Sequence, residues 1–325
     1  MSHTLVADNI YQVQLPLPFA LRSVNCYLLR GDNGWDIIDT GLHTPDGEAG
    51  WRAVFAELGV QPGDLRQVVV THHHPDHYGM AGWLREWNGG ELTIYMAARE
   101  LAMVEQVWWQ QEGMGAAFSA FMQRAGVSGD MLTGMLEVSA EIRTLTRPHP
   151  PTIDTITAGD VLTLGGRSLR VLNGPGHSVG QALLYDAADK LFFCADHILL
   201  KITPNVGLWP GSDDDPLAAF LDSLRELSAL DVRLGLPGHK TLIHDWQGRI
   251  AELEHHHDER LVGTAAAAGK GATALGVAQT IFDFRNFTFH EMRFAVAEAL
   301  AHLEYLRLRG ELRREVEDGV WVYRE

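Results

Sequence analysis

Short apolar runs alternate with glycine-rich turns along most of the chain. Four runs of strand length each lead into polar side chains, at residues 68–70, 169–172, 191–195 and 234–236. Such runs predict buried strands. Residues 8–40 predict further short strands around a turn at Gly31-Asp32-Asn33-Gly34. Residues 47–59 predict a helix, because apolar side chains recur there at helical spacing: Trp51, Val54, Phe55 and Leu58.

Residues 97–147 form a segment of a different kind. Long apolar side chains recur between Gly113, Gly115 and Gly126, which predicts a helical insertion beginning with a helix from Met96. Many of these side chains are methionine or aromatic, including Met103, Trp108, Met114, Phe118, Phe121 and Met122. Two interpretations stay open. The helices pack their apolar faces against each other, or they form a lid over a cleft, since methionine adapts to varied apolar shapes.

The carboxyl-terminal part, residues 249–325, predicts a separate small domain. Helical patterns occupy residues 252–263, a stretch starting near Thr273 and residues 291–309. Two short strands, 312–315 and 320–323, follow and turn at Glu317-Asp318-Gly319. Three helices and a hairpin suggest a winged-helix-like arrangement. Its acidic balance favours packing against the rest of the chain or a partner subunit over binding nucleic acid.

The most informative polar cluster directly follows the apolar run at residues 68–70. It has the sequence Thr71-His72-His73-His74-Pro75-Asp76-His77-Tyr78. Side chains alternate in extended backbone, so His72 and His74 point the same way and His73 the other. If the chain turns at Pro75, Asp76 and His77 reach the same pocket from a short helix start. Imidazole and carboxylate groups suit a divalent metal of the zinc or iron type.

Three more candidate ligands follow apolar runs or lie in glycine-flanked turns: His177, Asp196 and His239. Together with the first cluster they make seven, more than one zinc ion takes. We therefore expect two metal ions. His72, His74 and His177 would hold the first, Asp76, His77 and His239 would hold the second, and Asp196 would bridge them.

Five motifs in this order resemble the metallo-β-lactamase superfamily. They are Ile38-Asp39-Thr40-Gly41-Leu42, the histidine cluster, Gly174-Pro175-Gly176-His177-Ser178, Cys194-Ala195-Asp196 and Pro237-Gly238-His239. The resemblance implies an α+β fold, a four-layer αβ/βα sandwich, over residues 1–248, with a dinuclear site between the sheets along one edge. It also implies that Asp39 orients ligands without being one. Ala195 stands where the family usually has glycine, which concerns backbone fit.

One subgroup of that superfamily has a similar winged-helix tail, and it shares the Ile202-Thr203-Pro204-Asn205 and His256-His257-Asp258-Glu259-Arg260 segments. That subgroup includes endoribonucleases, so a metal-dependent endoribonuclease is the alternative function. A mononuclear iron persulfide dioxygenase is a weaker alternative, because the seven ligands exceed the two histidines and one aspartate of that design.

Composition narrows the partners. The 325 residues carry a formal net charge of −16 and no run rich in Lys and Arg, which disfavours nucleic acid. Two cysteines make no disulfide framework. No signal peptide and no apolar stretch of membrane-spanning length is evident, so we expect a cytoplasmic protein without a membrane partner. A homodimer stays open.

Two metal ions that share one bridging hydroxide would give a nucleophile at neutral pH. Asp76 is placed both to ligate and to accept a hydrogen bond from that hydroxide, so it is the catalytic candidate. The predicted reaction is hydrolysis of an ester-like bond in a small acyl substrate, such as a thioester or lactone. Zinc is the first expectation for the metal, with iron and manganese open.

The substrate pocket is predicted around Tyr78 and the insertion, with Trp108, Trp109, Met114 and Phe118 on its wall. Adjacent helical residues point about 100° apart, so at most one of Trp108 and Trp109 faces the cleft. We expect Ser178 to stabilise a turn, and His197 to point away from the ligands. Of His255, His256 and His257, one could bridge to the carboxyl-terminal domain.

Overall fold

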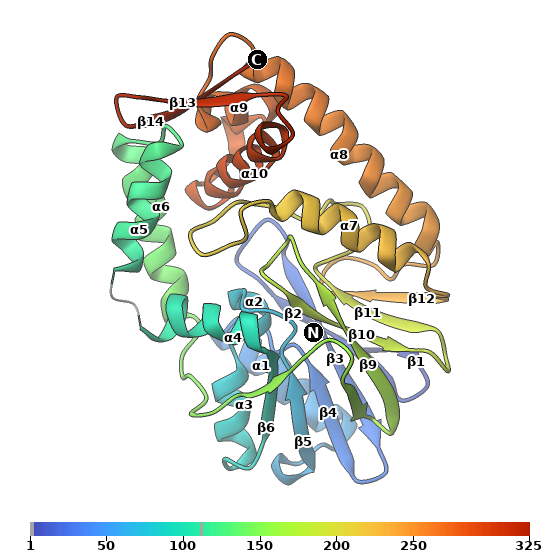
Figure 1. Ribbon diagram of the computed structural model, residues 1–325. Helices are drawn as coiled ribbons and strands as arrows, with labels where there is room; N and C mark the ends of the chain where they lie inside the picture. The colour runs from blue at the N-terminus through green and yellow to red at the C-terminus, as the bar shows by residue number, and fades with distance from the viewer. Residues whose placement is uncertain (1–2, 111–112) are drawn as a thin grey trace.

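Two β-sheets lie face to face between two layers of helices (Figure 1). The computed structural model describes residues 3–110 and 113–325. The first sheet has seven strands in chain order: β1 His3–Ala7, β2 Ile10–Pro16, β3 Ser23–Gly31, β4 Gly34–Ile38, β5 Leu65–Val69, β6 Thr93–Ala97 and β7 Asp154–Ile156. Neighbours are antiparallel from β1 to β4 and parallel from β4 to β7.

The second sheet has the order β12-β11-β10-β9-β8. Its strands are β8 Val161–Leu164, β9 Arg167–Gly174, β10 Gln181–Asp186, β11 Leu191–Ala195 and β12 Leu234–Pro237. β11 and β12 are parallel and the other neighbours antiparallel. The inner faces of the two sheets share one apolar cluster, in which Tyr27, Ile38 and Val69 meet Val171, Leu184 and Phe193. This shared core holds the two sheets together.

Helices cover both outer faces, as the resemblance implied. α1 (Pro45–Leu58) and α3 (Ala81–Asn88) bury Trp51, Phe55 and Leu84 against the first sheet. α7 (Pro216–Ser228) and α8 (Trp246–Ala268) bury Phe220 and Trp246 against the second. A 3₁₀ turn, η1 (Pro62–Asp64), precedes β5, and the short α2 (Pro75–Tyr78) follows it. The four-layer αβ/βα sandwich is therefore confirmed.

The insertion between β6 and β7 is helical, as predicted. It contains α4 (Ala98–Val104), the π-helical turn η2 (Glu105–Trp109), α5 (Met114–Arg124) and α6 (Gly129–Thr144). The helix expected from Met96 was wrong at its start, because Met96 and Ala97 pair with Thr155 and Ile156 in the sheet. The expected helix extends over residues 111–112, which lie outside the described residues.

The carboxyl-terminal part contains the second half of α8, then α9 (Ala274–Ile281), η3 (Phe284–Asn286), α10 (Phe289–Leu308) and the hairpin of β13 (Arg313–Glu317) and β14 (Val320–Arg324). The helix expected at residue 252 begins earlier, at Trp246, where Asp245 caps it by accepting a hydrogen bond from Gly248 N. The predicted boundary at 248/249 consequently lies inside one continuous helix.

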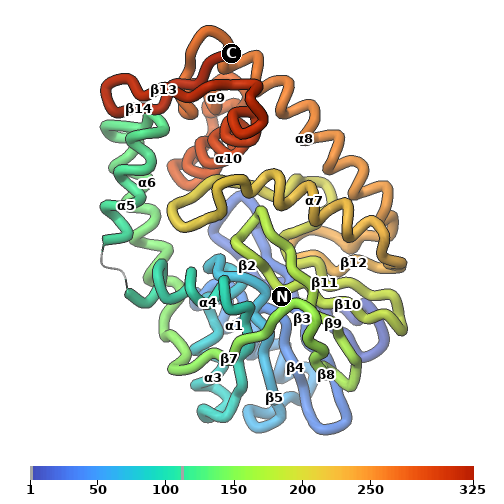
Figure 2. Tube along the Cα trace, in the orientation of Figure 1, coloured from blue at the N-terminus to red at the C-terminus, as the bar shows by residue number. Residues whose placement is uncertain are grey.

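The insertion and the carboxyl-terminal helices share an apolar core, although they are far apart in the sequence. Met122 and Met135 of α5 and α6 belong to the same buried cluster as Val277, Leu300 and Tyr323. The backbone of Leu275 also donates to Ala125 O at 2.9 Å. Figures 1 and 2 show α5 and α6 beside α9, α10 and the hairpin, above the sheets. We call this combined unit (residues 98–110, 113–144 and 270–325) the roof.

Candidate metal centre

The seven candidate ligands meet at one edge of the sandwich, where strands of both sheets end. β5 leads into His72 and His74, and α2 carries Asp76 and His77. His177 lies in the turn between β9 and β10, Asp196 follows β11, and His239 follows β12. His74 is the N-cap of α2 and Pro75 its first residue, so the chain turns where the sequence placed the turn. This turn brings both halves of the cluster to one pocket.

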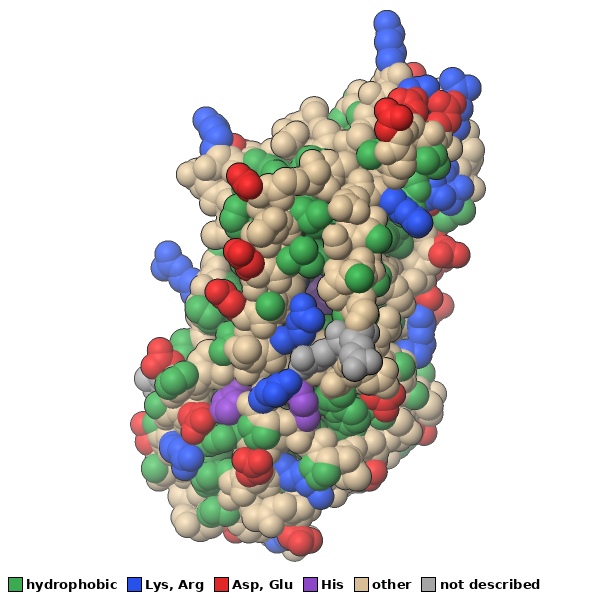
Figure 3. Space-filling view, turned by 90° about the vertical axis from the view of Figure 1, so that its left-hand side faces the viewer, with side chains coloured by type: hydrophobic (Ala, Val, Ile, Leu, Met, Phe, Trp, Pro, Cys, Tyr) green, Lys and Arg blue, Asp and Glu red, His purple; other side chains and the backbone are tan. Residues whose placement is uncertain are grey.

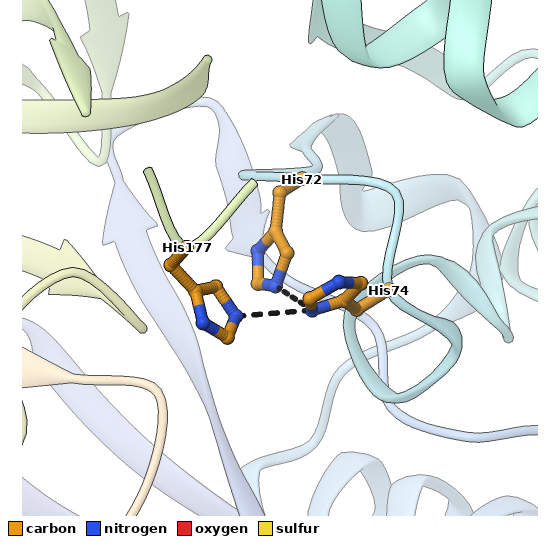
Figure 4. Close-up of side chains that lie close together, drawn as sticks. All are labelled: His72, His74 and His177. Carbon is orange, nitrogen blue, oxygen red and sulfur yellow. Dashed lines mark hydrogen bonds between the residues drawn. The ribbon is translucent and has the colours of Figure 1, made fainter. Parts of the chain in front are cut away.

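Three histidines make the first group of potential ligand atoms (Figure 4). His74 Nδ1 lies 3.0 Å from His72 Nε2 and 3.0 Å from His177 Nε2. His73 points away and places its Nδ1 2.6 Å from Glu100 Oε2. The predicted alternation is therefore confirmed, with His72 and His74 on one side of the loop and His73 on the other.

The second group contains Asp76, His77 and His239, whose ligand atoms lie within 4.8 Å of one another. Asp196 lies between the two groups. Its Oδ2 is 3.2 Å from His239 Nε2, 3.5 Å from His77 Nε2 and 3.6 Å from His177 Nε2. A single carboxylate thus reaches nitrogens of both groups, which is the placement a bridging ligand requires.

The outward-facing nitrogens of four of these imidazoles are held by other groups. His77 Nδ1 donates to Asp39 Oδ2 at 2.7 Å, His177 Nδ1 to Asn205 O at 2.8 Å and His239 Nδ1 to Ser23 O at 2.8 Å. His72 Nδ1 lies 2.9 Å from the Thr71 hydroxyl, which itself donates to Asp39. Such partners fix the ring orientation and leave the other nitrogen for a ligand.

Burial lowers the pKa of His72, His74 and His177, so these imidazoles are neutral, the form that binds metal. Burial also acts to lower the pKa of His77 and His239. The nearby carboxylates of Asp196 and Asp76 have the larger effect and raise both pKa values, to about 10 for His239. A divalent cation would take the place of these protons, because a ligating imidazole must be neutral.

Three buried atoms of the cluster have no hydrogen-bond partner among the described residues: His77 Nε2, His239 Nε2 and Asp196 Oδ1. Leaving such atoms unsatisfied costs free energy. Imidazole nitrogens and carboxylate oxygens are suitable donors for zinc, iron or manganese. The residues present therefore fit bound metal ions.

Glu100, which the sequence argument missed, ties two ligand loops together. Its carboxylate is fully buried and accepts from the backbone N of His73 and Gly180 and from the Ser178 hydroxyl, at 2.7–2.9 Å. Burial raises its pKa, but the interactions with His73 and these donors lower it more, so Glu100 is ionised. No local motif pairs a residue of α4 with residues 178–180, so only the fold reveals this link.

Backbone geometry at Asp196 and His239 depends on small neighbours. A Cβ on Gly238 would lie 2.3 Å from Asp196 Oδ1 and 2.7 Å from His77 Cε1, so only glycine fits there. Ala195 has a φ of 44°, a left-handed conformation that glycine adopts more readily. Alanine at this position, where the family usually has glycine, is therefore expected to strain the backbone.

A cavity of about 450 Å³ extends from the ligand cluster into the roof. His74, Asp76, His177, Asp196 and His239 line its floor. Most of its walls are apolar, and they include the predicted Trp108, Met114 and Phe118.

Tyr78 and Trp109, which were also predicted to line the pocket, are not among the described residues that line this cavity. Trp109 Nε1 donates to the hydroxyl of Tyr78 at 2.9 Å, and Tyr78, the last residue of α2, is fully buried. Of the two adjacent tryptophans, Trp108 is therefore the one that faces the cavity.

The remaining histidines in question lie apart from the cluster. His197 Nδ1 accepts from Gln181 Nε2 at 3.4 Å, so its Nε2 carries the proton and donates to the Ser223 hydroxyl at 2.9 Å, on the far side of the strand end. His257 is buried and places its Nδ1 3.1 Å from His302 Nε2, joining α8 to α10. His257 is thus the member of its triplet that bridges to the carboxyl-terminal part.

A family model described as the metallo-beta-lactamase superfamily matches residues 20–239, and one described as the metallo-beta-lactamase-like C-terminal domain matches residues 262–325. The chain is 26% identical over 329 residues to a probable metallo-hydrolase of Bacillus subtilis, covering 99% of this chain and 97% of that protein. It is 22% identical to an atrochrysone carboxyl ACP thioesterase of Aspergillus fumigatus, over 73% of this chain and 57% of that protein.

Two solved structures are similar over nearly the whole length. A metallo-beta-lactamase family protein of Thermus thermophilus has 31% identity and a TM-score of 0.88, covering 98% of this chain and 99% of that one. A beta-lactamase domain protein of Burkholderia ambifaria has 32% identity and a TM-score of 0.88, covering 100% and 94%. In the described part of the chain, no helix is long and apolar enough to cross a membrane. The chain belongs to the metallo-β-lactamase superfamily and is a metal-dependent hydrolase of that superfamily with its C-terminal domain.

Proposed function

We propose that this enzyme is a dinuclear metallohydrolase that cleaves the ester-like bond of a small acyl substrate, such as a thioester or lactone. The observation that carries the proposal is the cavity of about 450 Å³, which joins the histidine and aspartate cluster to mostly apolar walls. That volume suits a small molecule, and apolar walls suit an acyl chain.

His72, His74 and His177 would hold one divalent ion, Asp76, His77 and His239 a second, and Asp196 would contact both. Such ions lower the pKa of water and polarise a carbonyl oxygen. Asp76 lines the cavity as well as belonging to the cluster. Its carboxylate can therefore accept a proton from the attacking water and direct the oxygen lone pair toward the acyl carbon. The apolar walls exclude bulk water around the acyl chain.

The relative from Aspergillus fumigatus is named a thioesterase, which supports the thioester arm of the proposal. This chain spans only 57% of that relative, so the proposal takes from it the bond type and not the acyl group. An endoribonuclease is disfavoured by the net charge of −16 and by the mostly apolar cavity. A mononuclear iron enzyme would leave one of the two ligand groups without a role.

Metal analysis and a substrate panel test the proposal together. We expect about two metal ions per chain and hydrolysis of thioesters or lactones, with little action on phosphodiesters or short RNA. Asp76→Ala should lower kcat strongly while the group of three histidines keeps its metal. Asp222→Ala, on the exposed face of α7, is the matched control and should behave like the wild type. One iron per chain, or cleavage of RNA alone, would overturn the proposal.

A further inference from the structure

Arg293 of α10 brings a positive charge to the wall of the cavity. One face of its guanidinium lies over the Phe294 ring, 4.8 Å from the centroid. Its Nη2 donates to His290 Nδ1 at 3.2 Å, and its Nη1 lies 3.4 Å from the Ser139 hydroxyl. Its Nε is buried and has no hydrogen-bond partner among the described residues. The guanidinium is therefore held in place but incompletely satisfied.

Arg293 forms no ion pair with the carboxylates that the structure describes. The two acidic residues of α10 that line the same cavity are engaged elsewhere. Glu291 accepts from Thr288 N and Oγ1 at 2.7 and 2.8 Å, and Glu298 accepts from Asn205 Nδ2 at 2.9 Å. A partly buried guanidinium without a counter-ion is costly. Burial lowers the pKa of Arg293 to about 10, which still leaves it charged at neutral pH.

Two further polar groups stand beside Arg293 on the cavity wall. Arg143 of α6 also lines the cavity, and its Nε donates to Ser139 O at 3.1 Å. His290 accepts from Arg293 through Nδ1, so its proton is on Nε2, and its ring stacks on Phe19 at 4.5 Å. On the face seen in Figure 3, basic side chains lie beside histidines in the lower half of the molecule, and acidic side chains are scattered among hydrophobic ones over the rest. The roof thus offers several donors and few free acceptors.

We propose that Arg293, with Arg143 and His290 beside it, binds an oxyanion of the acyl substrate at the end remote from the bond that is cleaved. This inference rests on the proposed acyl hydrolase function and narrows its substrate class to acyl compounds that carry a carboxylate or a phosphate. The guanidinium fork can donate two parallel N–H bonds to either group. The metal-binding residues and Arg293 line one cavity, so a single substrate can contact both.

The kinetic test compares thioesters that differ only in charge. Glutaryl and pentanoyl thioesters of N-acetylcysteamine have equal acyl length, and only the first has a terminal carboxylate. Wild-type enzyme should prefer the glutaryl compound, and Arg293→Gln should lower kcat/KM for it by about 10- to 100-fold, the range for one charge-assisted pair. The pentanoyl compound should change by less than about 3-fold, because it makes no charged contact.

A second arm separates the two sources of negative charge. Pentanoyl-coenzyme A carries phosphates that pentanoyl-N-acetylcysteamine lacks. A preference for the coenzyme A compound that Arg293→Gln abolishes would assign Arg293 to phosphate, whereas an effect confined to the glutaryl compound would assign it to carboxylate. If Arg293→Gln lowered kcat/KM equally for the glutaryl, coenzyme A and neutral pentanoyl compounds, neither preference would depend on Arg293 and the inference would be overturned.

Binding measured without turnover separates this inference from the proposed function. Glutarate and inorganic phosphate serve as probes, read as an increase in Tm of the metal-loaded protein. Arg293→Gln should reduce the increase, Arg293→Lys should restore part of it, and Arg143→Gln should reduce it less. Arg225→Gln, on the exposed face of α7, is the control. Absence of thioesterase activity with a probe shift that depends on Arg293 would reject only the proposed function. Equal shifts in all variants would reject the anion site.

Discussion

The floor and the roof of the cavity are built in opposite ways. The floor is a set of buried, charged and hydrogen-bonded side chains at strand ends, and each of its ligands lies within a short local motif. The roof is mostly apolar and combines α5 and α6 with α9, α10 and the hairpin, which are separated in the sequence by the whole second sheet. From this difference we expect the floor to determine the reaction class and the roof to determine substrate choice.

The largest effect should come from removing the carboxylate shared by both halves of the floor. Asp196→Ala takes away the group that lies within 3.6 Å of three ligand nitrogens. We expect kcat/KM to fall by at least about 10³-fold and metal content to drop well below two per chain. Elemental analysis and kinetics on the same preparation check this. Full metal content together with normal activity would show that Asp196 is not a shared ligand.

Glu100 joins the floor from its outer side, so its loss should be smaller. Glu100→Gln keeps the shape but removes the charge that holds His73, Ser178 and Gly180. We expect metal affinity or kcat/KM to fall by about 10- to 100-fold, as is typical for groups that orient ligands. Competition with a chelator measures the affinity. Glu86→Gln, on the exposed side of α3, should change nothing.

The roof should affect selectivity more than rate. Trp108→Ala removes a large side chain from the wall and so enlarges the cavity. The preference between short and long acyl thioesters should change by about 10-fold, while the metal content stays the same. Trp109→Phe removes only the bond to Tyr78 behind the wall and should leave that preference unchanged. An unaltered preference in Trp108→Ala would make the insertion a packing element instead of a selectivity element.

Acid should weaken the junction between α8 and α10. Burial lowers the pKa of His257 to about 2 and of His302 to about 4. The neutral form of these rings therefore contributes its full stability above about pH 6.5, the ordinary histidine pKa. This contribution is lost as the pH falls toward 4, by up to about 1.4 kcal/mol per group and pH unit. Tm measured from pH 8 to 5 should fall less steeply in His302→Leu than in the wild type. Equal slopes would show that the pair does not control acid stability.

The smallest effect concerns the backbone before Asp196. Ala195→Gly relieves the φ of 44° but gives the unfolded chain more freedom, so the two contributions partly cancel. We expect a gain in unfolding free energy of less than about 1 kcal/mol and unchanged metal content, measured by denaturant unfolding. A loss of stability would show that the strain at this φ is smaller than the entropic cost of glycine in the unfolded chain.

The sequence by itself determined the fold class, through motifs that resemble the superfamily, and it identified the candidate ligands of the floor. Apolar runs predicted β5, β9, β11 and β12, and alternation along residues 72–74 put His72 and His74 on one side and His73 on the other. These are local consequences of backbone geometry, so a single stretch of sequence contains the information. Helix geometry predicted that at most one of Trp108 and Trp109 faces the cavity, but not which one, nor that Tyr78 and Trp109 lie behind the cavity wall.

Only the tertiary structure decided what surrounds the floor. The link from Glu100 to Ser178, the hydrogen bond from His177 to Asn205, and the position of Arg293 beside Ser139 all join segments far apart in the chain. α8 passes through both predicted domains because its apolar side chains meet the second sheet at one end and the roof at the other. Such pairings depend on how elements pack, which no local pattern of polar and apolar residues encodes.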